Sequence, residues 1–317
     1  MSNTTKVIAV VGATGAQGGG LVRSILADGA GEFAVRAITR NPWSDAAREL
    51  ARAGAEVVAA DLADAGSVTA AFRGAYGAYC VTFFWNHMSP DREREEARVL
   101  ARAAQAAGLQ HVVWSTLEDT RRWVPVDDPR IPTLQGNYKV PHFDVKGEAD
   151  EFFRAAGVPT TFMLTSFYWD NLITFGMGPK TGADGRLHFA LPLGERLLPG
   201  IAAEDIGRCA HGIFRRGTSM AGQRIGIAGA HLTGAQMASA LSRAFGRECV
   251  YDAVPFEAFR RLGFPGADDL GNMFEMQHEY NDEFCAMRSV GNSRALNPRL
   301  QDFDSWLADN AAKILPA

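Results

Sequence analysis

The sequence contains few lysines, few cysteines and no long apolar run. Only five of the 32 basic residues are lysines, so a lysine that falls in a motif is informative. The four cysteines form no CxxC pair and the seven histidines form no HExxH, so neither a metal site nor a redox dithiol is expected. No apolar stretch reaches about 18 residues and no signal-peptide pattern opens the chain, which predicts a cytoplasmic protein without a membrane span.

The chain also has no excess of charge of one sign. The 32 basic and 36 acidic residues give a formal net charge of −4, and the basic residues do not cluster. Direct binding to nucleic acid or to an anionic membrane is therefore not expected. With 317 residues, 47% of them hydrophobic, the composition is that of a globular protein of one or two domains.

Short apolar strands alternate with amphipathic helices through the first half of the chain. This pattern predicts an α/β fold, a Rossmann-type doubly wound parallel sheet formed by residues 1–165. After residue 165 the alternation weakens, which predicts that 166–317 form a smaller α+β lobe interwoven with the sheet. The expected strands are 7–11, 34–38, 56–60, 78–81, 111–115, 160–164 and 223–227; the expected helices lie near 18–28, 45–53, 66–73, 90–107, 142–156, 203–214, 233–245, 255–262 and 267–286.

A glycine-rich turn follows the first expected strand. It has the pattern Gly-x-x-Gly-x-x-Gly and consists of Gly12, Ala13, Thr14, Gly15, Ala16, Gln17 and Gly18. Such glycines allow a tight turn, backbone approach to a pyrophosphate and close packing of helix on strand, while the helix N-terminus attracts phosphate. No Lys-Ser/Thr follows the last glycine, which excludes a P-loop. The strand–turn–helix context favours a dinucleotide site over a purely structural turn.

The end of the second strand indicates which nucleotide is bound. An NAD-preferring site usually has an acid there for the ribose 2′-hydroxyl, whereas this chain has Thr39-Arg40-Asn41-Pro42. A guanidinium suits a 2′-phosphate, so Arg40 predicts NADP(H), with a solvated surface arginine as the alternative. Asp61 and Leu62, after the third strand, are expected to flank adenine. Thr82, Phe83 and Phe84, after the fourth, are expected on the nicotinamide side or in ordinary loop packing.

Taken together, these motifs resemble the NmrA-like family of atypical short-chain dehydrogenase/reductases. The resemblance rests on residues 12–19, 39–42, 140–148, 168–172 and 262–274. It implies nucleotide contacts from the positions above and from Lys146, Tyr168, Trp169, Asp170 and Asn171. Family members include NADPH-responsive regulators and a fungal corepressor. The chain departs from the basic pattern of animal members at Trp43-Ser44-Asp45, which leaves Arg40 as the one expected 2′-phosphate ligand.

The catalytic residues of an active short-chain reductase are only partly present. Such enzymes pair a serine on the fifth strand with Tyr-x-x-x-Lys on the next helix, where the phenol donates a proton. This chain has Ser115 and Lys146, but His142 occupies the tyrosine position. His142 is either a ligand-contacting residue of the pocket or the proton donor. The isoflavone-reductase-like relatives, which resemble this arrangement, keep the lysine without the tyrosine.

The segment 119–140 is long for a loop, rich in Asp and Pro, and contains Trp123 and Tyr138. Loops of this length are usually lids or binding segments. With Phe84, Trp85 and residues 167–169, the segment is expected to form either an aromatic pocket or a hydrophobic cluster under a loop.

The sequence favours one function and leaves a second open as the alternative. The first is a redox-state sensor that binds NADP(H) and acts through a regulatory protein partner. The second is an NADPH-dependent reductase of a small quinone, enone or aromatic carbonyl compound that uses Lys146 and His142. The missing tyrosine favours the sensor, whereas Lys146 and Ser115 favour the enzyme. Assembly into a homodimer is left open.

Overall fold

The computed structural model describes residues 5–315, which form two compact units. Unit 1 consists of the chain up to Glu118, Val145–Leu164 and Glu204–Ile225. Unit 2 consists of Asp119–Asp144, Thr165–Ala203 and the chain from Gly226 onward. The chain passes between the two units after Glu118, Asp144, Leu164, Ala203 and Ile225.

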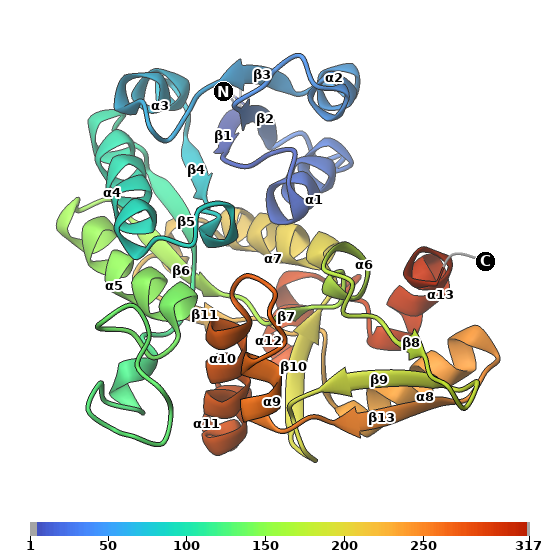
Figure 1. The fold of residues 1–317 in the computed structure, drawn as a ribbon. Helices are drawn as coiled ribbons and strands as arrows, with labels where there is room; N and C mark the ends of the chain where they lie inside the picture. The colour runs from blue at the N-terminus through green and yellow to red at the C-terminus, as the bar shows by residue number, and fades with distance from the viewer. Residues whose placement is uncertain (1–4, 316–317) are drawn as a thin grey trace. The chain divides into compact units, whose positions relative to one another are not determined.

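Unit 1 is built on a seven-stranded sheet of order β11-β6-β5-β4-β1-β2-β3 (Figure 1). The pairs from β6 through β3 are parallel, and the strand order reverses between β1 and β4, as in a Rossmann-type doubly wound sheet. This confirms the expected fold class. The strands are β1 (Lys6–Val10), β2 (Phe33–Thr39), β3 (Glu56–Ala59), β4 (Gly77–Cys80), β5 (His111–Thr116), β6 (Thr160–Leu164) and β11 (Arg224–Gly226).

Helices cover both faces of this sheet. On one face, α3 (Ala65–Phe72), α4 (Pro90–Ala106) and α5 (Pro141–Ala155) bury apolar side chains against the strands; Trp114 of β5 stacks on Phe153 of α5 at 4.7 Å between ring centroids. On the other face, α1 (Ala16–Leu26) packs against α7 (Ala203–Arg216), where a Cβ at Gly207 would lie 2.0 Å from the backbone nitrogen of Leu21. The short helix α2 (Asp45–Arg52) follows β2.

Helix α4 begins as its sequence predicts. Ser89 is the N-cap and its hydroxyl accepts the N–H of Arg92, Pro90 is the first helical residue, and Asp91 and Glu93 lie in the first turn. The start of this helix matters below, because Glu93 points into the interior of the unit with no exposed surface.

Unit 2 contains two three-stranded sheets, of order β12-β10-β7 and β13-β9-β8 (Figure 1). The helix expected over 267–286 is two helices, α10 and α11, because the backbone leaves helical geometry at Tyr280 (φ −111°, ψ 38°). The strands are β7 (Phe167–Tyr168), β8 (Lys180–Thr181), β9 (Leu187–Leu191), β10 (Leu197–Ile201), β12 (Ala230–Thr233) and β13 (Cys249–Ala253). The helices are α6 (Asn171–Thr174), α8 (Gly234–Phe245), α9 (Phe256–Arg260), α10 (Ala267–Glu279), α11 (Asn281–Ala286), α12 (Val290–Leu296) and α13 (Phe303–Ile314).

Buried polar groups hold the segment 119–140 within unit 2. The ammonium of Lys139 donates to the carbonyl oxygens of Asp128 and Ile131 at 2.7 Å each. The Asn272 amide donates to the carbonyl oxygens of Pro132 and Lys139 at 2.8 and 2.6 Å. Because these donors are buried and satisfied by backbone carbonyls, the segment has a defined path even though it contains little regular structure.

Between residues 5 and 315, the structure has no helix that is both long enough and apolar enough to cross a membrane.

Candidate functional site

The glycine-rich turn lies at the carboxyl edge of the unit 1 sheet, where the strand order reverses. Gly12 has φ +65°, and the N–H of Ala13 donates to the carbonyl oxygen of Ile38 at the end of β2. A Cβ at Gly18 would lie 2.4 Å from the carbonyl oxygen of Gly12, so this position accepts only glycine without movement of the backbone. Thr14, Gly15 and Ala16 are exposed, and no side chain caps the start of α1. The N–H groups of this helix end can therefore receive a phosphate.

The expected adenine-side residues follow the neighbouring strands. Arg40 is exposed directly after β2, and the N–H of Ala60 donates to the carbonyl oxygen of Thr39, which brings the ends of β2 and β3 together. Asp61 is exposed and its Oδ1 accepts the N–H of Ala63 at 2.9 Å; Leu62 is half-buried. These loops share one edge of the sheet with the glycine-rich turn.

The loop after β4 divides its side chains between solvent and interior. Thr82 is buried, whereas Phe83 is 59% exposed. Phe84 is buried and makes edge contacts with the rings of Trp85 and His87. A Cβ at Gly12 would contact Val81 at 3.3 Å, which places this loop beside the glycine-rich turn. Of the two phenylalanines, Phe83 has the surface that could contact a ligand.

Lys146 lies on α5 and directs its ammonium into unit 1. It donates to the carbonyl oxygen and the hydroxyl of Thr82 at 3.1 and 2.7 Å, and it lies 2.8 Å from Glu93 Oε1. The Trp114 ring is 5.3 Å from the ammonium. The ammonium is therefore held among three oxygens that belong to Thr82 and Glu93.

Glu93 is the buried counter-charge of Lys146. It also accepts the Thr82 hydroxyl at 2.6 Å. Burial alone would raise its pKa, but the charge of Lys146 and hydrogen bonds from His87, Lys146 and Thr82 outweigh burial and lower the pKa to about 2. None of the sequence motifs described above includes Glu93. The sequence does contain a signal for this residue. The buried stripe of α4 consists of Pro90, Glu93, Ala97 and Leu100, and Glu93 is its one charged member.

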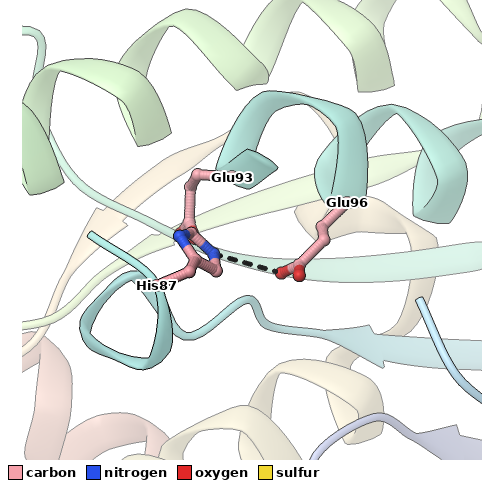
Figure 2. Close-up of side chains that lie close together, drawn as sticks. All are labelled: His87, Glu93 and Glu96. Atoms are coloured by element: carbon pink, nitrogen blue, oxygen red, sulfur yellow. Dashed lines mark ion pairs between the residues drawn. The ribbon is translucent and has the colours of Figure 1, made fainter. Parts of the chain in front are cut away.

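His87 lies between two carboxylates of α4 (Figure 2). Its Nε2 is 3.4 Å from Glu93 Oε2 and 3.8 Å from Glu96 Oε2. Burial, and then the charge of Glu93, raise the pKa of Glu96. His87 Nδ1 accepts the backbone N–H of Ser89 at 3.0 Å, so the proton of the neutral ring is on Nε2. A metal at this cluster would need the lone pair of Nε2, and the Lys146 ammonium would repel it, so the residues do not fit a metal centre well.

Ser115 is tied to the glycine-rich turn. Its hydroxyl donates to Gln17 Oε1 at 2.8 Å, and the Tyr79 hydroxyl donates to the same oxygen. The structure thus brings Ser115 and Gln17 together within unit 1. The neighbouring Thr116 hydroxyl instead bonds to Asp150 Oδ1 at 2.7 Å.

His142 is held by an aspartate that the sequence did not indicate. Its Nδ1 lies 2.6 Å from Asp269 Oδ1, and its backbone N–H donates to Asp269 Oδ2 at 3.1 Å. Both side chains are buried in unit 2. Since a carboxylate only accepts, Nδ1 carries the proton and Nε2 is the acceptor of a neutral ring. The carboxylate fixes the ring orientation, as the acidic partner of a catalytic histidine does.

The last group of expected nucleotide contacts has evident structural partners in unit 2. Trp169 is 1% exposed and packs against Phe303 and Trp306 of α13. Asp170 Oδ2 accepts the N–H of Ala203 at 2.8 Å, and Asn171 begins α6. Tyr168 ends β7 and is half-buried.

The aromatic residues expected around a pocket also make contacts inside unit 2. Trp123 stacks on Tyr280 at 6.0 Å between ring centroids, and the guanidinium of Arg121 lies 5.2 Å from the Tyr138 ring. Phe167 packs near Phe274 at 6.4 Å. These contacts resemble a hydrophobic cluster more than an open aromatic pocket.

The chain is similar to proteins of one family and to solved structures that share its fold. The model of the NmrA-like family matches residues 4–307. The NmrA-like family domain-containing oxidoreductase FrzB of Cladobotryum sp. is 31% identical over 85% of this chain and 83% of its own. The solved structure of NmrA, a negative transcriptional regulator, in complex with NADP is 25% identical, with a TM-score of 0.77 over 98% of this chain and 96% of that one. Triphenylmethane reductase of Citrobacter sp., solved with NADP(H), shares the fold at 19% identity, with a TM-score of 0.74 over 96% and 99% of the two chains.

Proposed function

Because the chain belongs to the NmrA-like family, we propose that unit 1 binds NADP(H) and that the protein is an oxidoreductase of small organic compounds. One observation carries the nucleotide assignment. The uncapped N-terminus of α1, the glycine-only positions Gly12 and Gly18 and the exposed Arg40 lie along the same sheet edge. A phosphate suits the helix end, and a 2′-phosphate suits the guanidinium. The related NmrA structure contains NADP, which supports the same assignment.

In the proposed reaction, some residues of this chain would position the loops at the nucleotide and one would donate a proton. Bound NADPH supplies the hydride. Lys146 fixes the loop after β4 through both polar groups of Thr82, and Ser115 fixes Gln17 beside the glycine-rich turn. His142, oriented by Asp269 within unit 2, is the proposed proton donor: in its imidazolium form it would give the Nε2 proton to a nascent alkoxide or enolate and become the neutral ring. A quinone, an enone or an aromatic carbonyl compound would accept a hydride and a proton in this way.

The second candidate is a redox-state sensor that acts through a regulatory protein partner. One observation favours it: the ammonium of Lys146 is in contact with Thr82 and Glu93, and no tyrosine occupies the position of His142. The related NmrA is a negative transcriptional regulator, which is consistent with this candidate. A sensor would bind the nucleotide without consuming it.

Two measurements separate these candidates. Calorimetric titration with NADPH and NADH tests the nucleotide assignment, and we expect tighter binding of NADPH. NADPH oxidation is then followed with a panel of quinones, enones and aromatic aldehydes. Turnover of about 1 s⁻¹ or faster, the lower end of ordinary enzymes, supports the oxidoreductase. Binding without turnover across the panel favours the sensor, and failure to bind either nucleotide contradicts both.

A further inference from the structure

Glu93, Lys146 and Thr82 form a closed set of contacts, here called the buried triad. The Thr82 hydroxyl accepts from Lys146 at 2.7 Å and donates to Glu93 Oε1 at 2.6 Å. The same carboxylate oxygen lies 2.8 Å from the ammonium. Glu93 has no exposed surface, and the side chains of Thr82 and Lys146 are also buried. Each polar group of the triad therefore depends on the other two.

A buried ion pair of this kind contributes little net stability. Removal of two charges from water costs several kcal/mol per ion, and well-packed apolar residues often stabilise a core equally well. In this chain the pair also includes a lysine, a residue type that occurs only five times. A positional role is the natural explanation, since buried charge pairs fix geometry through directional contacts.

The contacts of the triad indicate that it positions the backbone at the end of β4. Lys146 donates to the carbonyl oxygen of Thr82 as well as to its hydroxyl, so it restrains the backbone at the point where the chain leaves β4. The exposed Phe83 follows directly. Val81 precedes Thr82 and lies close enough to Gly12 that a Cβ there would meet its side chain at 3.3 Å, so the restrained backbone borders the proposed nucleotide edge.

We propose that Glu93 is a positioning residue for the nicotinamide half of the bound nucleotide. It fixes the Lys146 ammonium, which fixes the backbone of Thr82 and the orientation of Phe83. The adenine half, held by Arg40 and the glycine-rich turn, does not depend on this triad. The inference rests on the proposed NADP(H) function and adds a residue of α4 that lies beyond the family motifs described above.

A comparison of two ligands tests the proposal on the whole protein. NADPH contains both halves of the nucleotide, whereas adenosine 2′,5′-bisphosphate contains only the adenine half with its 2′-phosphate. In Glu93→Gln, we expect affinity for NADPH to fall about tenfold or more, the scale of a lost charged hydrogen bond. Affinity for adenosine 2′,5′-bisphosphate should stay within about twofold of wild type. Glu95→Gln is the matched control, because Glu95 is an exposed residue of the same helix, paired with Arg98.

A milder variant covers the case in which Glu93→Gln does not fold. Thr82→Val removes the bridging hydroxyl but keeps the Glu93–Lys146 ion pair and the shape of the side chain. It should lower NADPH affinity in the same selective way, by a smaller factor. Unchanged NADPH affinity in the folded variants, or equal loss for both ligands, overturns the positioning role. Failure of the wild-type protein to bind either ligand would instead contradict the proposed function itself.

Discussion

The ammonium of Lys146 lies 2.8 Å from the carboxylate of Glu93, and the pair is enclosed in the interior of unit 1. In short-chain reductases the corresponding lysine is expected to hold the ribose and to lower the pKa of a tyrosine. Here the ammonium lies among oxygens of Glu93 and Thr82. In this structure the lysine thus restrains the loop after β4.

Replacement of Arg40 tests the choice of nucleotide. Arg40→Ala should weaken NADPH binding by about 1.5–3 kcal/mol, the scale of a charged hydrogen-bonded contact. NADH has no 2′-phosphate, so its binding should barely change. Calorimetric titration of both nucleotides gives the comparison. Equal losses for the two would show that Arg40 does not contact the 2′-phosphate.

The pair His142 and Asp269 tests the proton donor. His142→Ala should lower kcat by about 10²–10⁴-fold, the usual contribution of a general acid, and leave NADPH affinity nearly unchanged. Asp269→Asn should give a smaller loss, because the amide oxygen can still accept one of the two His142 N–H groups, while the NH2 group is directed at the other. Asp268→Asn, an exposed neighbour on α10, is the control. An unchanged kcat in His142→Ala would remove this residue from the reaction.

The burial of His111 predicts that the folded protein loses stability in mild acid. Burial lowers the pKa of this histidine to about 4, and its Nε2 lies 2.9 Å from the Thr161 hydroxyl. An unfolded histidine titrates near 6.5, so between about pH 6.5 and 4 the unfolded state binds a proton that the folded state does not. The free energy of unfolding should therefore fall as pH decreases through this range, by up to roughly 3 kcal/mol at 1.36 kcal/mol per pKa unit. Urea denaturation at pH 7 and pH 4.5 measures this, and His111→Gln should show a flatter profile; identical profiles would contradict it.

Gly18 should be intolerant of any side chain. In Gly18→Ala the new Cβ would meet the carbonyl oxygen of Gly12 at 2.4 Å, so the glycine-rich turn must move. We expect destabilisation of roughly 1–3 kcal/mol, as for an overpacked site, together with weaker NADPH binding. Gly29→Ala is the matched control, since nothing lies within 4 Å of a Cβ there. Thermal unfolding and titration report the two effects, and a Gly18→Ala protein that matches Gly29→Ala in both would refute this reading of the turn.

The sheet of unit 1 could be predicted from the sequence because its strands are short continuous apolar runs. The expected 160–164 agrees with β6 in both bounds, and the other strands differ by a residue or two. The strands of unit 2 could not be located in this way. β8 is only Lys180–Thr181, and two residues carry no periodic pattern. The apolar period of 267–286 continues across Tyr280, so the sequence does not show where α10 ends.

The backbone of the candidate site could be predicted from the sequence, whereas most of its buried charged residues could not. The glycine-rich turn is a local pattern, and the structure places it where such a pattern belongs. Glu93 could have been identified, since it is a charge on the apolar stripe of α4. Asp269 could not, because it lies 127 residues from His142 along the chain and only the folded structure brings them together.

The carboxylate of Asp144 shows how strictly a buried acceptor constrains its own replacement. Its Oδ1 accepts the backbone N–H and the hydroxyl of Thr120, and its Oδ2 accepts the N–H groups of Lys139 and Val140. Burial raises the pKa of this carboxyl, and these four donors oppose that effect. Asparagine has nearly the same shape, yet in either orientation its amide would direct an N–H at another N–H. If relatives keep an aspartate at this position and never an asparagine, the reason would be the four hydrogen-bond donors around the carboxylate. Its place two residues before Lys146 would not be needed to explain it.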